Sequence, residues 1–167
     1  MVRVALISDS HGFMDEQIVK HCADVDEIWH AGDIGDIRIL SLLPSAAAHR
    51  IITGNIDDQA ARLEYPEFTS FEIEGLKIGM LHIAGNPPRY AKGVKKLIQE
   101  EGLKVLVCGH SHICKVVFDQ DLQCLYMNPG AIGHQGFHQV RTLLKFEIAN
   151  AKVQNLRVVE LGRRGRM

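Results

Sequence analysis

The sequence predicts an α/β fold with two sheets of mixed strand direction and helices on their outer faces. Apolar runs alternate with short helical segments in the first part of the chain, a β-α-β-α-β order that is typical of a parallel sheet with right-handed crossovers. Later strands are separated by tight turns, which favour antiparallel pairing. The 167 residues are enough to bury a substantial core, and we expect a single domain over residues 1–167.

The first strand is expected at Val2–Ile7, an apolar run that ends in a polar, glycine-containing segment. Met14, Ile18 and Cys22 then recur at helical spacing. Three more elements are expected before the middle of the chain: strands at 27–30 and 50–52, and a brief helix at 37–43.

In the second part, Glu74-Gly75 separates two strand-like runs at 68–73 and 76–82, which predicts a hairpin. The segment Gly85–Pro88 is expected to open a helix that has Tyr90, Val94, Leu97 and Ile98 on one face. The remaining strands are expected at 105–108, 115–118, 122–127, 142–148 and 152–159.

Composition and charge narrow the function classes. The chain is 46% hydrophobic and 23% charged with a net charge of -1, which argues against nucleic-acid binding driven by overall basicity. We find no apolar run of membrane-spanning length and no signal-peptide pattern. The four cysteines lack C-x-x-C spacing and are expected to be reduced thiols. We therefore expect a cytoplasmic protein without a membrane partner, whose basic segment 162–167 frays.

Metal-binding residue types follow five of the predicted strands. They are Asp9 with His11, Asp33, Asn55, His82, and His110 with His112. Each one alone could simply make a turn, cap a helix or lie on the surface. The carboxyl ends of parallel strands, however, lie side by side where open α/β sheets bind their ligands. The joint placement therefore predicts one cleft.

Seven oxygen and nitrogen ligands exceed the four of a closed structural zinc site. They suit two divalent transition-metal ions, roughly 3.5–4 Å apart, that share a bridging carboxylate and a bridging water. Carboxylate, carboxamide and imidazole ligands do not choose among manganese, iron, nickel, cobalt and zinc, and we take Mn²⁺ as the first expectation. Such a pair supplies hydroxide near neutral pH and neutralises phosphoryl oxygens, so phosphoester hydrolysis is the natural reaction.

The candidate ligands lie in ordered motifs. These are Asp9-x-His11, Gly32-Asp33-x-x-Asp36, Gly54-Asn55-x-Asp57, His82, Gly109-His110-x-His112 and Asn128-Pro129-Gly130-Ala131. In order and spacing they resemble the motif series of the calcineurin-like metallophosphoesterases, and the short chain resembles the small bacterial and archaeal phosphodiesterase branch. The resemblance spans residues 2 to about 160. It implies a four-layer α-β-β-α sandwich with the active site at the strand ends.

The resemblance also implies a role for each residue. One ion would be held by Asp9, His11, Asp33 and His112. The other would be held by Asp33, Asn55, His82 and His110, so that Asp33 bridges the two. Asp33 and Asn55 are the expected catalytic residues, since Asn55 would also contact the phosphate while a bridging hydroxide attacks phosphorus in line. Asp36 and Asp57 are expected to orient histidines or loop amides.

Two positions differ from the family pattern. Many phosphatases of the family have a histidine directly after the asparagine, where it helps to protonate the leaving group, and here that position is Ile56. We therefore expect diesters or aryl esters to be hydrolysed faster than monoesters of poor leaving groups. The usual His-Gly-His segment reads His82-Ile83-Ala84, so its second histidine is lost.

His134, His138 and Arg141 follow the Asn128-Pro129-Gly130 loop. They could reach a substrate phosphate or supply the missing acid, or they could simply form local hydrogen bonds. Substrate specificity is expected to come from the loops at 83–90 and 131–140.

The favoured hypothesis is a dinuclear metal-dependent phosphodiesterase that acts on a small phosphoester. The sequence does not decide whether the protein is a monomer or a homo-oligomer. The alternative is a metal-binding protein-interaction scaffold, because a retromer subunit with a similar fold is known chiefly as a protein-binding module. The completeness of the ligand set favours an enzyme. A nuclease would predict a basic groove or an extra domain, and neither is evident.

Overall fold

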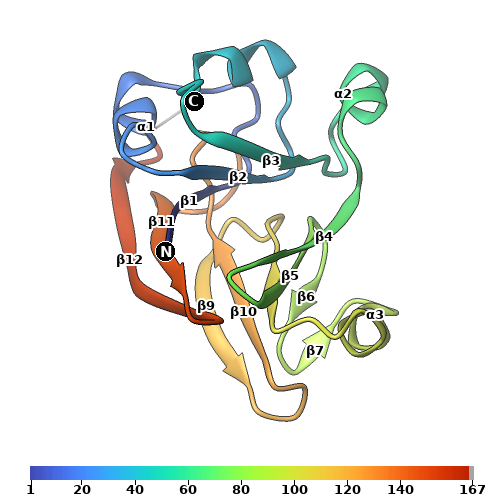
Figure 1. The fold of residues 1–167 in the computed structure, drawn as a ribbon. Coiled ribbons are helices and arrows are strands. Elements are labelled where there is room, and N and C mark those ends of the chain that lie inside the picture. The colour runs from blue at the N-terminus through green and yellow to red at the C-terminus, as the bar shows by residue number, and fades with distance from the viewer. Residues whose placement is uncertain (166–167) are drawn as a thin grey trace.

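The computed structural model describes residues 1–165, which fold around two five-stranded sheets (Figure 1). Sheet A has the strand order β12-β11-β1-β2-β3, and sheet B has the order β4-β5-β8-β10-β9. The strands of sheet A are β1 (Val2–Ile7), β2 (Glu27–Ala31), β3 (Ala48–Ile52), β11 (Val140–Ala149) and β12 (Lys152–Arg163). Those of sheet B are β4 (Phe68–Ile73), β5 (Leu76–Leu81), β8 (Val105–Val107), β9 (Cys114–Asp119) and β10 (Cys124–Pro129).

Both sheets are mixed, as expected. Strands β1, β2 and β3 are parallel, and β11 joins β1 in the antiparallel direction. In sheet B, β5, β8 and β10 are parallel, with β4 and β9 antiparallel at the two edges. The parallel strands therefore carry their carboxyl ends to one edge of each sheet, where the loops after them can meet.

Three apolar cores separate four layers. Alternate residues of β1 face opposite sides, because side chains alternate along a strand. Val4 and Leu6 join the core between the sheets, whereas Ala5 and Ile7 join the core between sheet A and its helices. A third core, around Ile98, lies between sheet B and a helix. The expected four-layer sandwich is confirmed.

The helices are short and begin at capping residues. They are α1 (Glu16–His21), the 3₁₀ helix η1 (Ile37–Leu42), α2 (Gln59–Glu64) and α3 (Val94–Glu101). The carboxylates of Asp15, Asp36 and Asp58 accept backbone amide hydrogens in the first turns of α1, η1 and α2, which satisfies donors that a helix leaves free at its start.

The expected start of the third α-helix is wrong. Residues 85–90 form a small hairpin of β6 (Gly85–Asn86) and β7 (Arg89–Tyr90), and α3 begins only at Val94. Between the two strands lie Pro87 and Pro88, which lack amide hydrogens and disfavour helical geometry in the residues before them. Tyr90 is therefore part of a strand.

Two further differences concern the ends of elements. Helix α2 was not predicted from the sequence. Strand β12 continues to Arg163, so the expected fraying does not begin at residue 162, and Arg166 and Met167 lie outside the described residues. Among the helices of residues 1–165, none has the length and apolar character needed to cross a membrane.

Candidate metal centre

The loops after β1, β2 and β8 bring four metal-binding side chains together. Their ligand atoms all lie within 4.8 Å of one another, and the residues are Asp9, His11, Asp33 and His112. Nε2 of His112 is 3.1 Å from Oδ1 of Asp9 and 3.3 Å from Nε2 of His11. Two imidazole nitrogens and two carboxylates thus converge on one small volume, a donor set that suits a divalent transition metal.

A second group shares Asp33 with the first. It comprises Asp33, His82 and His110, again with ligand atoms within 4.8 Å of one another. Nε2 of His82 lies 3.1 Å from Oδ1 of Asp33, while Nε2 of His11 lies 3.7 Å from Oδ2. The two oxygens of one buried carboxylate therefore face two different groups.

The donors come from both sheets. Asp9, His11 and Asp33 follow β1 and β2 of sheet A, whereas His82 follows β5 of sheet B. His110 and His112 follow β8, which is also in sheet B. The candidate centre thus lies across the junction of the two sheets.

The backbone at these positions is unusual. Five of the candidate ligands adopt positive φ angles of +48° to +68°, and they are Asp9, His11, Asp33, His110 and His112. This conformation costs an L-residue roughly 1–2 kcal/mol, and clusters of it are typical of functional sites. Backbone hydrogen bonds hold the first two loops together: the amide of Asp9 donates to Gly32 and that of His11 donates to Asp33, both at 3.0 Å.

Gly54 allows the close approach of the donors. A β-carbon there would lie 2.8 Å from Cδ2 of His82 and would also clash with the Asp33 carboxylate. Any larger residue would therefore push apart two of the side chains that make up the second group.

Hydrogen bonds fix which ring nitrogens are free to bind a metal. Nδ1 of His82 lies 2.7 Å from the Ala31 carbonyl oxygen, to which it must donate. Its Nε2 is buried, has no hydrogen-bond partner within residues 1–165 and points at the group containing Asp33. In the neutral ring Nε2 therefore carries no hydrogen, and a buried nitrogen of this kind aimed into a cluster of carboxylates is what a metal ligand requires, so these residues fit a divalent cation.

A second chain of contacts orients His112. Nε2 of His138 is 3.0 Å from the Gly133 carbonyl oxygen and must donate to it, which leaves Nδ1 as an acceptor. That Nδ1 lies 3.3 Å from Nδ1 of His112. His112 therefore carries its proton on Nδ1 and directs Nε2 toward Asp9. This contact gives His138 a role that the sequence pattern did not indicate.

Burial and charge oppose each other at the ionisable groups. Burial lowers the pKa of His11 despite the nearby carboxylates. For His82 burial also acts downward, but the close contact with Asp33 and the charge of Asp9 outweigh it and raise the pKa. Burial alone would raise the pKa of Asp33, yet His82 holds it below its usual value. The pocket thus favours anionic carboxylates that are balanced by positive charge.

Asp57 and Asp36 occupy different environments. The Asp57 carboxylate is buried and accepts the amide hydrogens of Gly35 at 2.8 Å and Gly54 at 2.7 Å. It therefore joins the loops that carry Asp33 and Asn55. Asp36 accepts from the amide and the guanidinium of Arg38 at the protein surface, because it caps η1, and so it lies outside the cluster.

Asn55 borders a cavity beside the second group. The cavity has a volume of about 290 Å³. It is lined by Thr53, Gly54, Asn55, Arg62, Glu67, Leu81, His82 and Ile83. Asn55 itself is exposed, so its amide can reach a ligand that enters next to His82.

The structure does not bring His134 or Arg141 to the cluster. The Arg141 guanidinium is buried and donates to the carbonyl oxygens of Ile132 and Leu161 and to Asp15. His134 packs edge-on against Phe13, with ring centroids 4.2 Å apart, and its Nδ1 contacts the Arg164 carbonyl oxygen. These partners explain why neither side chain faces the candidate ligands.

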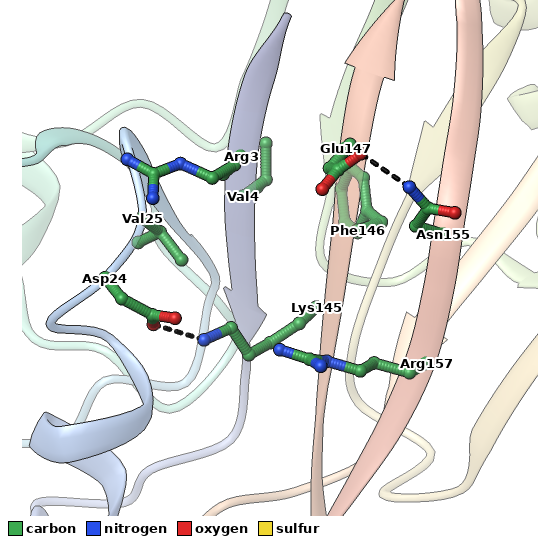
Figure 2. Close-up of a pocket in the computed structure, with 9 residues that line it drawn as sticks. All are labelled: Arg3, Val4, Asp24, Val25, Lys145, Phe146, Glu147, Asn155 and Arg157. Carbon is green, nitrogen blue, oxygen red and sulfur yellow. Dashed lines mark hydrogen bonds and ion pairs between the residues drawn. The ribbon is translucent and has the colours of Figure 1, made fainter.

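A separate pocket of about 170 Å³ lies near the start of β1, whereas the candidate ligands follow the ends of strands. Figure 2 shows its nine lining residues, which are Arg3, Val4, Asp24, Val25, Lys145, Phe146, Glu147, Asn155 and Arg157. Its carboxylates are already engaged, Asp24 by Lys145 and Glu147 by Asn155 (Figure 2). The pocket is therefore an ion-paired surface feature and does not present free metal ligands.

A sandwich of two mixed sheets with oxygen and nitrogen donors at its strand ends defines an α/β protein with a candidate centre for two cations. Residues 2–151 match the family model of the calcineurin-like phosphoesterase superfamily domain. A probable metallophosphoesterase of Methanothermobacter thermautotrophicus is 30% identical over 133 residues, which cover 77% of this chain and 76% of the relative.

Solved structures agree in fold. Vps29 of Entamoeba histolytica, complexed with Zn²⁺, has a TM-score of 0.74 at 14% identity, covering 98% of this chain and 99% of that chain. An archaeal phosphodiesterase has a TM-score of 0.70 at 21% identity, covering 95% and 99%. The chain belongs to the calcineurin-like phosphoesterase superfamily, and the resemblance of its motifs is confirmed.

Proposed function

We propose that this protein is a dinuclear metal-dependent phosphodiesterase. The observation that carries the proposal is Asp33, whose two carboxylate oxygens face two separate groups of donors. A buried carboxylate between two such groups is the arrangement that a pair of ions needs. The proposal treats residues 1–167 as one domain, since the core between the sheets is built from strands of both halves of the chain.

Each residue has a definite part in this proposal. One ion would be held by Asp9, His11, Asp33 and His112, and the other by Asp33, Asn55, His82 and His110. When bound, two divalent ions supply an activated water nucleophile and Lewis acidity toward the phosphoryl oxygens. Manganese is the proposed native metal, with iron, nickel, cobalt or zinc as alternatives that the same donor types accept.

The chain's own residues position the phosphate and limit the leaving group. The Asn55 amide can donate a hydrogen bond to a phosphoryl oxygen from its exposed loop, which Asp57 and Arg62 hold by hydrogen bonds to Gly54. Ile56, the next residue, is 45% exposed and has no proton to give. A leaving group that departs without protonation, such as a phenolate, is therefore favoured, and a monoester of a poor leaving group is not.

The proposed location is the cytoplasm, and the proposed partner is a small phosphoester. All four cysteines are free thiols and three of them are buried, which suits a reducing compartment. A homo-oligomer remains compatible with this proposal, since the site is built from one chain.

The test is hydrolysis of bis-(p-nitrophenyl) phosphate compared with p-nitrophenyl phosphate. Metal-stripped protein would be assayed after separate addition of Mn²⁺, Ni²⁺, Co²⁺, Zn²⁺ or Mg²⁺. We expect metal-dependent turnover with the diester ahead. Turnover of neither ester by metal-loaded protein would contradict the enzyme and favour a protein-interaction scaffold of the same fold.

A further inference from the structure

The cavity beside Asn55 and His82 has apolar walls and polar edges. Leu81 and Ile83 contribute apolar side chains, and Ile83 is 42% exposed although it follows a candidate ligand directly. Asn55 contributes an exposed amide group, whereas Thr53 is buried and its hydroxyl donates to the Pro66 carbonyl oxygen. An exposed isoleucine gains free energy only when something apolar covers it, so its position next to the centre points to a ligand with an apolar surface.

Arg62 forms a fixed part of the cavity wall. Its guanidinium donates to the Asp57 carbonyl oxygen at 3.0 Å, to the Gly54 carbonyl oxygen at 2.8 Å and to the Glu67 carboxylate. Three acceptors from three directions hold the planar group in one orientation. A guanidinium plane held in this way stacks well against an aromatic ring.

The charge of Arg62 is already balanced. Glu67 forms an ion pair with it, so the described residues that line the cavity offer no spare cation with which to bind a second phosphate group. A neutral substituent is favoured over a phosphorylated one for the same reason, because an anion would lie near the Glu67 carboxylate without compensation.

We propose that this cavity receives one ester substituent of the substrate, and that this substituent is a flat ring with apolar faces and a polar edge. Ile83 and Leu81 cover the ring, Arg62 stacks on it, and the exposed Asn55 amide reaches its edge. The chemical class is an aryl or nucleoside phosphodiester. The inference rests on the proposed function, because it assumes that the phosphate lies at the candidate metal centre, and it makes Ile83 a specificity-determining residue.

The test compares phenylphosphonate with methylphosphonate, which share the phosphonate group, differ in one substituent and have no ester bond to hydrolyse. Their dissociation constants for Mn²⁺-loaded protein would be measured by calorimetry, a readout that needs no turnover. For the unaltered protein we expect phenylphosphonate to bind about ten-fold more tightly, the gain expected from covering part of one ring. In Ile83→Ser the ratio should fall below about three-fold, and in Ile83→Leu it should be retained.

The matched control is Leu63→Ser. Leu63 is an 81% exposed apolar residue on α2 and does not line the cavity, so its replacement should leave the ratio unchanged. An equal loss in both serine variants, or a ratio near one in the unaltered protein, would overturn the inference. Failure of the proposed function would give a different result from failure of this inference. Diester hydrolysis would then be absent with every metal, while the ratio of the two dissociation constants could still be measured.

Discussion

The His82 ring lies across the junction of the two sheets, with its Nδ1 2.7 Å from the carbonyl oxygen of Ala31. His82 follows β5 of sheet B, whereas Ala31 ends β2 of sheet A. This single contact fixes the tautomer and leaves Nε2 free beside Asp33. A backbone carbonyl group of sheet A thus determines which ring nitrogen of a histidine from sheet B is free to bind a metal.

We expect Asp33→Asn to lose both metal ions. The amide has one weakly basic oxygen in place of two anionic ones, and both groups of donors depend on it. Metal analysis after dialysis should show a fall from about two ions per chain to fewer than one, with loss of phosphoesterase activity. Asp36→Asn is the control, because Asp36 caps η1 outside the cluster, and metal content should stay near two.

We expect His138→Ala to weaken metal binding about 10- to 100-fold, because His138 orients the His112 ring. Competition with a chelating dye would measure the apparent affinity. His134→Ala removes a nearby histidine that does not touch His112, and it should change the affinity less than two-fold. Equal effects of both replacements would mean that the loop, and not the His138–His112 contact, matters.

We expect Asp57→Asn to destabilise the fold by about 1–3 kcal/mol. The two Asp57 oxygens each accept a backbone amide hydrogen, from Gly35 and Gly54. An amide side chain has only one acceptor oxygen, so one buried N–H group would lose its partner. Urea unfolding would measure the difference, with the exposed Asp121→Asn as a control expected to lie within about 0.5 kcal/mol of the unaltered protein.

Stability should fall as the pH decreases from about 6.5 to 4, in part because of His30. Its ring is fully buried, and burial lowers its pKa to about 4. Below the usual histidine pKa the unfolded chain therefore binds a proton that the folded chain does not, which favours unfolding. Between pH 7 and pH 5 the contribution is roughly 1–2 kcal/mol. Urea midpoints should depend less on pH in His30→Gln, and His49→Gln, an exposed site, should keep the original slope.

We expect Ile56→His to raise hydrolysis of a monoester more than that of a diester. A histidine at this exposed position supplies the acid that a poor leaving group needs, an effect worth about 10²-fold where its geometry is right. The ratio of kcat/KM for methyl phosphate, whose alkoxide leaving group needs a proton, and bis-(p-nitrophenyl) phosphate would measure it. Ile56→Gln changes polarity without adding an acid and should leave the ratio unchanged.

The sequence predicted the features that depend on local chemistry. Val2–Ile7 reads as a strand because it is a bounded apolar run, and it forms β1 with the same bounds. The residues expected at the metal centre follow strand ends, and parallel pairing brings such positions together within each sheet, whereas their meeting across two sheets was implied only by the resemblance to the family. The layer order and the proposed grouping of the donors into two sets were therefore predicted through that resemblance and not from local chemistry.

Other features depend on contacts that no local pattern encodes. Helix α2 buries only Ala61 among its residues, so its sequence lacks the helical spacing of apolar residues that would have predicted it. Asp58 caps the helix, but a single aspartate is weak evidence for a helix start. Arg141 follows the Asn128-Pro129-Gly130 loop, which suggested a role in substrate binding. Its guanidinium instead points into the protein, where it donates to the carbonyl oxygens of Ile132 and Leu161. The His138–His112 contact likewise joins residues far apart in the chain.

If the centre binds cations as proposed, the distribution of the candidate ligands over both sheets would link cation supply to the lifetime of the protein. A cation held by Asp33 of one sheet and His82 of the other binds only while the two sheets are together. Mass action then shifts the folding equilibrium by about 1.4 kcal/mol for each ten-fold excess of free metal over its dissociation constant. When metal is scarce the sheets would separate more often, and proteases would degrade the chain faster.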